Sequence, residues 1–330
     1  MLAKKFSLRL DNGQEVGTTP MLVPSISSRI NIDIIKIIKM ISETMTGPVL
    51  ISAYDMKYIE NFPEISFPSL LFVDSGGYEC AKDKEISEIG LYRPDSHEWN
   101  RDRHSQIIER LETSPPPKVV ISYDHPSERM SIEEQIRCAK ESFNTKEGII
   151  KELLIKPELI ESSKLNIRGI MQNLEALSPF DIVGFTEKEL GSSVLERMIA
   201  IARIRREMNR NDINIPIHVF GSLDPVTTPL YYMSGADIFD GLSWLRFIFS
   251  GGNAFYIDSF GPLCDGIHVN MNQIWGMNMA KNNNYIGRLN RNLGKFQSTG
   301  EYKFLGEYQE YPNFYKNSYE DLIEEIGGEN

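Results

Sequence analysis

Carboxylate side chains follow apolar runs of this chain, at points where buried strands would end. Asp74 closes the run Leu70–Val73 and is followed at once by Ser75, Gly76, Gly77 and Tyr78. The glycines indicate a tight turn at which the backbone can approach a ligand, and the aromatic ring suits a flat molecule. An Asp that caps a turn would give the same pattern, so this motif alone leaves both interpretations open.

Three further polar residues end apolar runs downstream. They are Asp124, Gln172 and Asp240. In a barrel of parallel strands the carboxyl ends converge on one face, so we expect these side chains to lie near Asp74. Carboxylates grouped in a partly buried site repel one another, which raises some of their pKa values and suits acid–base catalysis.

The elements that would position these residues alternate along the chain. Strands are predicted over residues 48–53, 119–124, 167–172, 181–184, 215–221, 236–240 and 253–258, and helices over 30–42, 97–111, 132–143, 193–208 and 225–233. Ser131 with Glu134 is typical of a helix start. Most strand candidates are nearly continuous apolar runs, as strands buried on both faces require. The pattern favours a (β/α)8 barrel, and a doubly wound open sheet is the alternative, although no G-x-G-x-x-G motif occurs.

Composition limits the class of protein. The 330 residues are 41% hydrophobic and 25% charged, with a net charge of −11 and three widely spaced cysteines. No apolar run is long enough for a membrane span and no signal pattern is present, so a soluble cytoplasmic protein is expected. The acidic charge argues against a broad grip on nucleic acid. Local basic clusters occur at Arg203–Arg210 and Arg288–Lys295, for which solvated helix faces are the simpler interpretation.

The motifs, taken in order, resemble the tRNA-guanine transglycosylase superfamily, whose members exchange guanine for a 7-deazaguanine base. The matching segments are Asp74–Tyr78, Ser122–Asp124, Gly169–Gln172, Val183–Gly191, His218–Gly221 and Gly235–Asp240, with Arg246 following. The segment Gly235–Asp240 is the most specific of these, because residue types and spacing both agree with the family's nucleophile segment.

The resemblance implies a role for each matching residue. Asp240 would be the nucleophile that attacks the ribose C1′, and Asp74 the general acid/base. Asp124 would accept hydrogen bonds from the base, while Gln172 and the backbone near Gly184 would donate to its O6. The remaining substrate-binding positions implied are Ser75, Gly76, Gly77, Tyr78, Phe220 and Arg246, with the rings of Tyr78 and Phe220 on either side of the purine.

The chain also departs from the family pattern. Only Cys264 and His268 remain where the family has a Cys-x-Cys-x-x-Cys…His zinc site, so no metal and no cofactor are expected. The expectation is one barrel domain over 1–330, with a helical segment from about 270 to 330 on or beside the barrel. The acceptor, tRNA or DNA, stays open, as do a homodimer and an operon-encoded protein partner. A deazaguanine-binding or partner-binding protein of a multi-protein defence system, and a barrel glycosidase acting on sugars, are the alternatives to a transglycosylase.

Overall fold

Eight parallel strands form a closed barrel. The computed structural model describes residues 2–30, 33–81, 97–111, 114–144 and 146–327. The strands follow one another around the barrel in the order β10-β3-β4-β5-β6-β7-β8-β9. Their bounds are β3 (Met21–Ile26), β4 (Val49–Ser52), β5 (Leu71–Asp74), β6 (Lys118–Ile121), β7 (Ile150–Ile155), β8 (Ile182–Thr186), β9 (Ile217–Phe220) and β10 (Ile238–Gly241). The (β/α)8 prediction is confirmed, and the open-sheet alternative is wrong.

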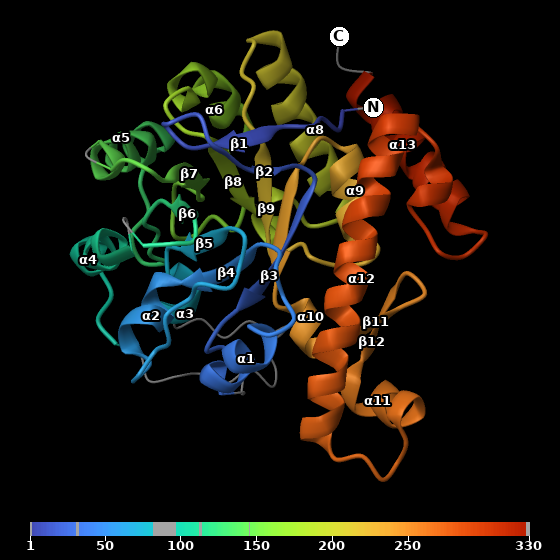
Figure 1. The fold of residues 1–330 in the computed structure, drawn as a ribbon. Coiled ribbons are helices and arrows are strands. Elements are labelled where there is room, and N and C mark those ends of the chain that lie inside the picture. The colour runs from blue at the N-terminus through green and yellow to red at the C-terminus, as the bar shows by residue number, and fades with distance from the viewer. Residues whose placement is uncertain (1, 31–32, 82–96, 112–113, 145, 328–330) are drawn as a thin grey trace. The chain divides into compact units, whose positions relative to one another are not determined.

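The chain divides into two compact units. One consists of residues 1–6, 18–24 and 186–330, and the other of residues 7–17 and 25–185. The second unit holds α1 (Ile34–Ile41), α2 (Ala53–Tyr58), α3 (Gly77–Cys80), α4 (Arg101–Leu111), α5 (Ile132–Phe143) and α6 (Ile167–Gln172), together with the small sheet of β1 (Ser7–Arg9) and β2 (Glu15–Thr18), whose last residue belongs to the first unit. Figure 1 shows these helices between successive strands.

The first unit carries the helices of the C-terminal half. These are α7 (Glu187–Leu190), α8 (Val194–Arg210), α9 (Thr227–Met233), α10 (Ser243–Arg246), α11 (Ile257–Asp265), α12 (Met271–Thr299) and α13 (Tyr311–Gly327). An antiparallel hairpin, β11 (Phe247–Ser250) and β12 (Asn253–Tyr256), precedes α11. The long helix α12 runs beside this hairpin (Figure 1), and α13 packs on α8 and α9.

Side chains of α12 hold the hairpin by hydrogen bonds to its backbone. Asn282 is fully buried; its Oδ1 accepts from the Phe249 N–H at 2.8 Å, and its Nδ2 donates to the carbonyls of Trp244 and Phe247, each at 2.6 Å. Asn278 Nδ2 donates to the same Phe247 carbonyl at 3.0 Å. Amide side chains therefore satisfy buried backbone groups in the segment where the sequence resemblance places a zinc-binding His.

Several predicted elements lie elsewhere than expected. Residues 167–172 form helix α6 rather than a strand, and Asn166 caps that helix by accepting from the Gly169 N–H at 3.0 Å. Residues 253–258 contribute β12 of the hairpin, not a barrel strand. Strands β3 and β7 were not predicted. The C-terminal segment forms helix α13 as far as Gly327, and its Leu322 and Ile326 are buried.

Most helix predictions are confirmed within one turn. Helix α5 spans the predicted residues, and the Ser131 hydroxyl accepts from the Glu134 N–H at 3.3 Å as the capping pattern requires. Of the helix predicted over 30–42, residues 31–32 lie outside the described residues. Within the described part of the chain, no helix is both long enough and apolar enough to cross a membrane.

Candidate active site

The turn that follows Asp74 requires glycine and is held by two aromatic side chains. Gly76 has φ of 85°, and a Cβ there would lie 2.8 Å from Tyr54 Cβ and 2.9 Å from Trp99 Nε1. Trp99 Nε1 also donates to the Ser75 carbonyl at 2.9 Å. The backbone beside the Asp74 carboxylate is therefore fixed by packing and by a hydrogen bond.

Asp124 approaches the same turn from the neighbouring strand. Strands β5 and β6 pair in parallel, and a Cβ on Gly77 would lie 2.5 Å from Asp124 Oδ2. The other oxygen, Oδ1, accepts from Arg129 at 2.9 Å, and Arg129 donates as well to the His125 carbonyl at 3.0 Å. The structure thus brings the Asp74 turn and Asp124 together, as predicted, and orients Asp124 through an arginine that the sequence did not point to.

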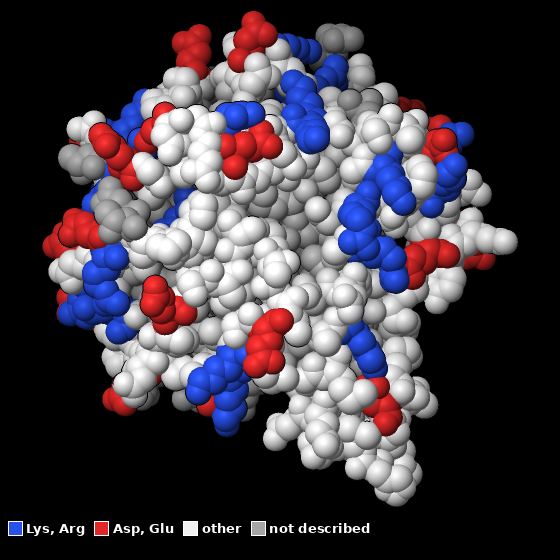
Figure 2. Space-filling model, in the orientation of Figure 1, with Lys and Arg blue, Asp and Glu red and all other residues white. Residues whose placement is uncertain are grey.

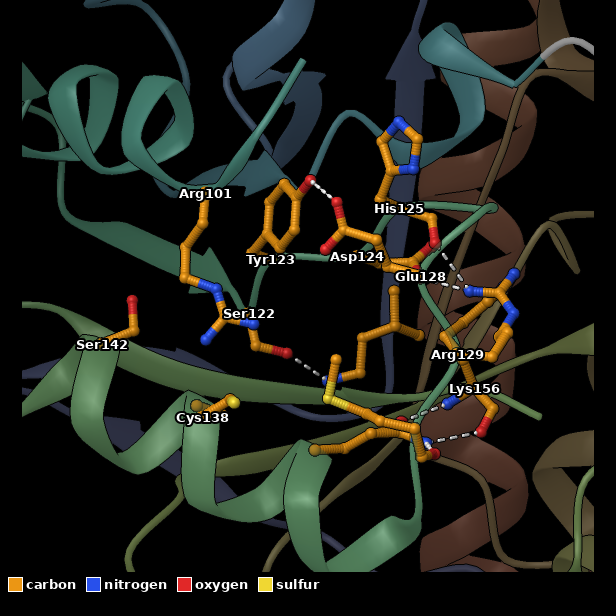
Figure 3. Close-up of a pocket in the computed structure, with 14 residues that line it drawn as sticks. Arg101, Ser122, Tyr123, Asp124, His125, Glu128, Arg129, Cys138, Ser142 and Lys156 are labelled. Carbon is orange, nitrogen blue, oxygen red and sulfur yellow. Dashed lines mark hydrogen bonds and ion pairs between the residues drawn. The ribbon is translucent and has the colours of Figure 1, made fainter. Parts of the chain in front are cut away.

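A pocket opens beside Asp124 and is lined by basic side chains from three elements. Figure 3 shows Arg101, Arg129 and Lys156 around it, together with Tyr123. The Arg101 guanidinium lies 5.6 Å from the centre of the Tyr123 ring. Planar, hydrogen-bonding and positively charged groups therefore share one concave surface with the carboxylate.

Gln172 does not lie at the end of a barrel strand. It is the last residue of α6 and is exposed to solvent, so the structure does not group it with Asp74 and Asp124. Lys156 instead follows β7 directly, and its side chain lines the Asp124 pocket. Residues Gly169–Gln172 therefore resemble the family's segment in residue types, but they do not lie at the end of a barrel strand.

Two buried carboxyl groups lie close to one another, and one of them, Asp55, also interacts with Asp74. Asp55 is 1% exposed and Glu79 is 6% exposed. The Ser27 hydroxyl donates to Glu79 Oε1 at 2.5 Å, and the Ser28 N–H donates to Asp55 Oδ2 at 2.8 Å. Asp55 Oδ1 and Glu79 Oε2 are buried without a hydrogen-bond partner. Each group is therefore only partly satisfied in its charged form, which favours the protonated form.

Burial is the main reason why these groups hold protons. The pKa of Asp55 is raised to about 6, mainly by loss of solvation and in smaller part by the charge of Asp74, while hydrogen bonds from Ser28 and Ser52 oppose the shift. Loss of solvation raises the pKa of Glu79 to about 7, with a further contribution from Asp55. Ser52, the N-cap of α2, pairs with Asp74 in the β4–β5 register. Asp55 and Glu79 therefore titrate near neutral pH, close to the predicted acid/base Asp74.

Asp240 lies in the other unit, where β9 and the turn after it orient its carboxylate. The Gly221 N–H donates to Asp240 Oδ1 at 3.0 Å, and His218 Nε2 lies 3.4 Å from the same oxygen. Gly221 has φ of 78°, a conformation that favours glycine. The His218 ring is fully buried and stacks on Phe220, with ring centres 3.9 Å apart. The Gly221 N–H therefore orients the carboxylate, and the His218 ring lies close to the same oxygen.

The remaining predicted residues have varied surroundings. Tyr78 is 38% exposed and one face of its ring meets the Arg29 guanidinium at 4.8 Å. Gly184 is buried in β8, where it pairs with Leu154. Arg246 ends α10 and is half-buried. These positions stay predictions as substrate contacts.

The part of the chain that the structure describes holds no group of three or more His, Cys, Asp or Glu side chains placed to bind a metal ion. Cys264 is exposed and Cys80 is buried, and burial raises the pKa of the Cys80 thiol to about 12. That thiol therefore stays protonated at neutral pH.

No protein-family model matches the chain, and no curated protein matches it either. The resemblance to the transglycosylase superfamily therefore depends on the motifs and on where the barrel places them.

Some residues of the site could have been found from the sequence and others could not. Ser52 and Asp55 fit the pattern of a helix start at the end of a predicted strand. Asp55 could therefore have been predicted from the sequence as a carboxylate near a strand end. His218 stands in a matched motif but has no family role to suggest its contact with Asp240. No local sequence pattern points to Arg129, because its ion pair with Asp124 depends on the conformation of the loop that joins them.

Proposed function

We propose that the protein is a base-exchanging glycosyltransferase that replaces guanine by a 7-deazaguanine base in tRNA or DNA, through a covalent intermediate on Asp240. The observation that carries the proposal is the orientation of Asp240 by the Gly221 N–H, with Asp240 in β10, the strand that resembles the family's nucleophile segment. In the other unit, the Asp74 turn and Asp124 lie against each other, and they would supply the acid/base and the polar base contacts that the reaction needs.

The proposed reaction has two displacements at the ribose C1′. A carboxylate oxygen of Asp240 attacks C1′, and the bond from C1′ to guanine N9 breaks as Asp74 protonates the leaving base. The incoming 7-deazaguanine then loses its N9 proton to Asp74 and attacks C1′, which releases Asp240. Two displacements retain the configuration at C1′, as in retaining glycosidases.

The raised pKa values of Asp55 and Glu79 fit this scheme. A pair that is partly protonated near neutral pH places less negative charge near Asp74, the residue that must gain and lose a proton. Lys156 takes the place proposed for Gln172 as a donor to the base, because it follows a barrel strand and lines the Asp124 pocket. Intracellular nucleic acid as the acceptor implies a cytoplasmic protein.

Labelled guanine incubated with tRNA or with DNA tests the proposal. The wild-type protein should incorporate label and form a covalent adduct, whereas Asp240→Asn should do neither, because an amide is a poor nucleophile. Asp240→Asn should still bind a free 7-deazaguanine in calorimetry, since the base contacts lie in the other unit. Exchange by the Asn variant at the wild-type rate would refute the mechanism.

A second candidate is hydrolysis of a glycosidic bond by the same carboxylates. It is favoured by the exposed position of Gln172, which removes one of the two base-reading residues that had spoken against it. Release of free base or sugar into water, without incorporation of labelled guanine, would identify this activity.

A further inference from the structure

The longest helix of the chain is also its most basic. Helix α12 runs for 29 residues and contains four Lys or Arg and no Asp or Glu, within a chain of net charge −11. The four are Lys281, Arg288, Arg291 and Lys295, and all are exposed. Such a concentration of one charge in an acidic protein marks a place where negative charge is bound rather than a general solvated surface.

The four cations share one face of the helix. At 3.6 residues per turn they fall within an arc of about 80° and extend over about 21 Å. Figure 2 shows basic side chains gathered in a line over α12. Asn284 is exposed on the same face, and amide side chains of this kind also contact phosphate and sugar. The helix therefore presents a basic, hydrogen-bonding strip, which we call the α12 strip (Lys281, Asn284, Arg288, Arg291 and Lys295).

Neighbouring acidic groups neutralise the α12 strip only in part. Arg288 pairs with Glu307 at 2.6 Å, and Lys281 pairs with Asp265. Lys295 lies 5.6 Å from the centre of the Phe304 ring, and Arg291 makes no ion pair within the described part of the chain. Ion pairs as exposed as the one at Arg288 contribute little, so a phosphate can replace the carboxylate at small cost.

We propose that the α12 strip binds the sugar-phosphate backbone of the polynucleotide acceptor. The choice of ligand rests on the proposed function; the charge, spacing and amide content of the strip are independent of it. A backbone presents negative charge at regular short intervals, which an elongated row of cations matches better than a compact anion does. RNA and DNA offer the same chemistry, and the test separates them.

Fluorescence anisotropy with labelled 20-nucleotide RNA, single-stranded DNA and duplex DNA tests this inference. The double variant Arg291→Gln with Lys295→Gln removes two cations of the strip. The matched control, Lys36→Gln with Lys39→Gln, removes two exposed lysines from α1. The strip variant should bind at least threefold more weakly than wild type and lower the slope of log K against log salt by about 1.4 for single strands or 1.8 for a duplex. The control should change neither, and both variants should unfold at the wild-type temperature.

The outcomes separate this inference from the proposed function. If wild type shows exchange activity and the strip variant binds the oligonucleotides as tightly as wild type does, the inference about the α12 strip is wrong and the proposed function stands. Strip-dependent binding without any exchange supports the strip and removes the proposed function. Equal loss in the strip variant and in the control, or binding to vesicles of anionic lipid but to none of the three oligonucleotides, overturns the inference.

Discussion

Asp55 and Glu79 keep protons at a pH at which exposed carboxyl groups have lost theirs. Their folded-state pKa values, about 6 and about 7, lie above the ordinary values because burial disfavours the charged form. The folded protein therefore binds these protons more tightly than the unfolded chain does. Their contribution to stability is fully present below about pH 4 and is lost as the pH rises through about 7.

Replacement of Glu79 by Gln should remove part of this pH dependence. Glutamine resembles the protonated form, so the gain of the variant over wild type should be small at pH 5 and should reach about 1–3 kcal/mol of unfolding free energy at pH 8. Urea unfolding at the two pH values measures the difference. The exposed Glu60→Gln serves as the control and should show no gain at either pH. A gain for Glu79→Gln that is equal at pH 5 and pH 8 would mean that the carboxyl group is not titrating.

Residue types indicated part of the site, and distant contacts account for the rest. Asp74 and Asp124 were predictable, because each follows an apolar run and neighbouring parallel strands bring such ends together. The pKa of Glu79 was not, since it depends on Ser27 and Asp55 from other strand ends. Contacts of this kind follow from the closed barrel and leave no pattern in the local sequence.

At the scale of elements, the packing of α12 on the hairpin depends chiefly on the buried amide of Asn282. Asn282 satisfies backbone groups of Trp244, Phe247 and Phe249, and no other residue type offers a donor and an acceptor in the same shape. Replacement by Ala removes these three hydrogen bonds, although the Phe247 carbonyl keeps its bond from Asn278.

Asn282→Ala should lower the free energy of unfolding by about 2–4 kcal/mol, because buried hydrogen bonds are lost and a cavity remains. Thermal or urea unfolding gives the value. Asn284→Ala, two residues along the same helix and exposed, is the matched control and should change stability by less than about 0.5 kcal/mol. Equal effects at the two positions would show that the amide contacts do not stabilise the hairpin.

Helices and strands were predicted correctly where the apolar periodicity was clear. They were missed or misassigned where charged residues interrupted the pattern or where the segment was too short. Helix α5 carries a capping Ser and a regular apolar face, and its bounds were predicted. Strand β7 was missed because Lys151 and Glu152 interrupt its apolar run, although Glu152 is fully buried. Residues 169–171 are too few to distinguish a buried strand from one side of a short helix, and only Ile170 of them is buried.

At the scale of the whole molecule, the unit that contains Asp240 is built from separate stretches of chain. Residues 18–24 supply the part of β3 that pairs with β10, and residues 1–6 belong to the same unit. Phe6 lies under the buried Arg205 guanidinium at 5.1 Å, and Arg205 is paired with Asp237. The C-terminal half therefore lacks essential neighbours when it is taken alone.

A fragment of residues 186–330 should not fold by itself. Without β3, the backbone groups of β10 that face it stay unpaired, and Arg205 loses its aromatic neighbour. Circular dichroism should show no cooperative thermal transition for this fragment. Co-expression with residues 1–185 is the control and should restore a transition. A cooperative transition for the isolated fragment would show that its own core is sufficient.

The pairing of β3 with β10 also sets an order of events during protein synthesis. Met21 leaves the ribosome long before its partner Ile238 has been made. At about 5–20 residues per second, this strand edge waits on the order of ten seconds or more for its neighbour. The run Met21–Val23 is apolar and buried in the finished barrel. The nascent chain therefore exposes an unpaired, aggregation-prone strand edge during that interval. Shielding by a chaperone that binds short apolar segments is the expected need of this protein in the cell.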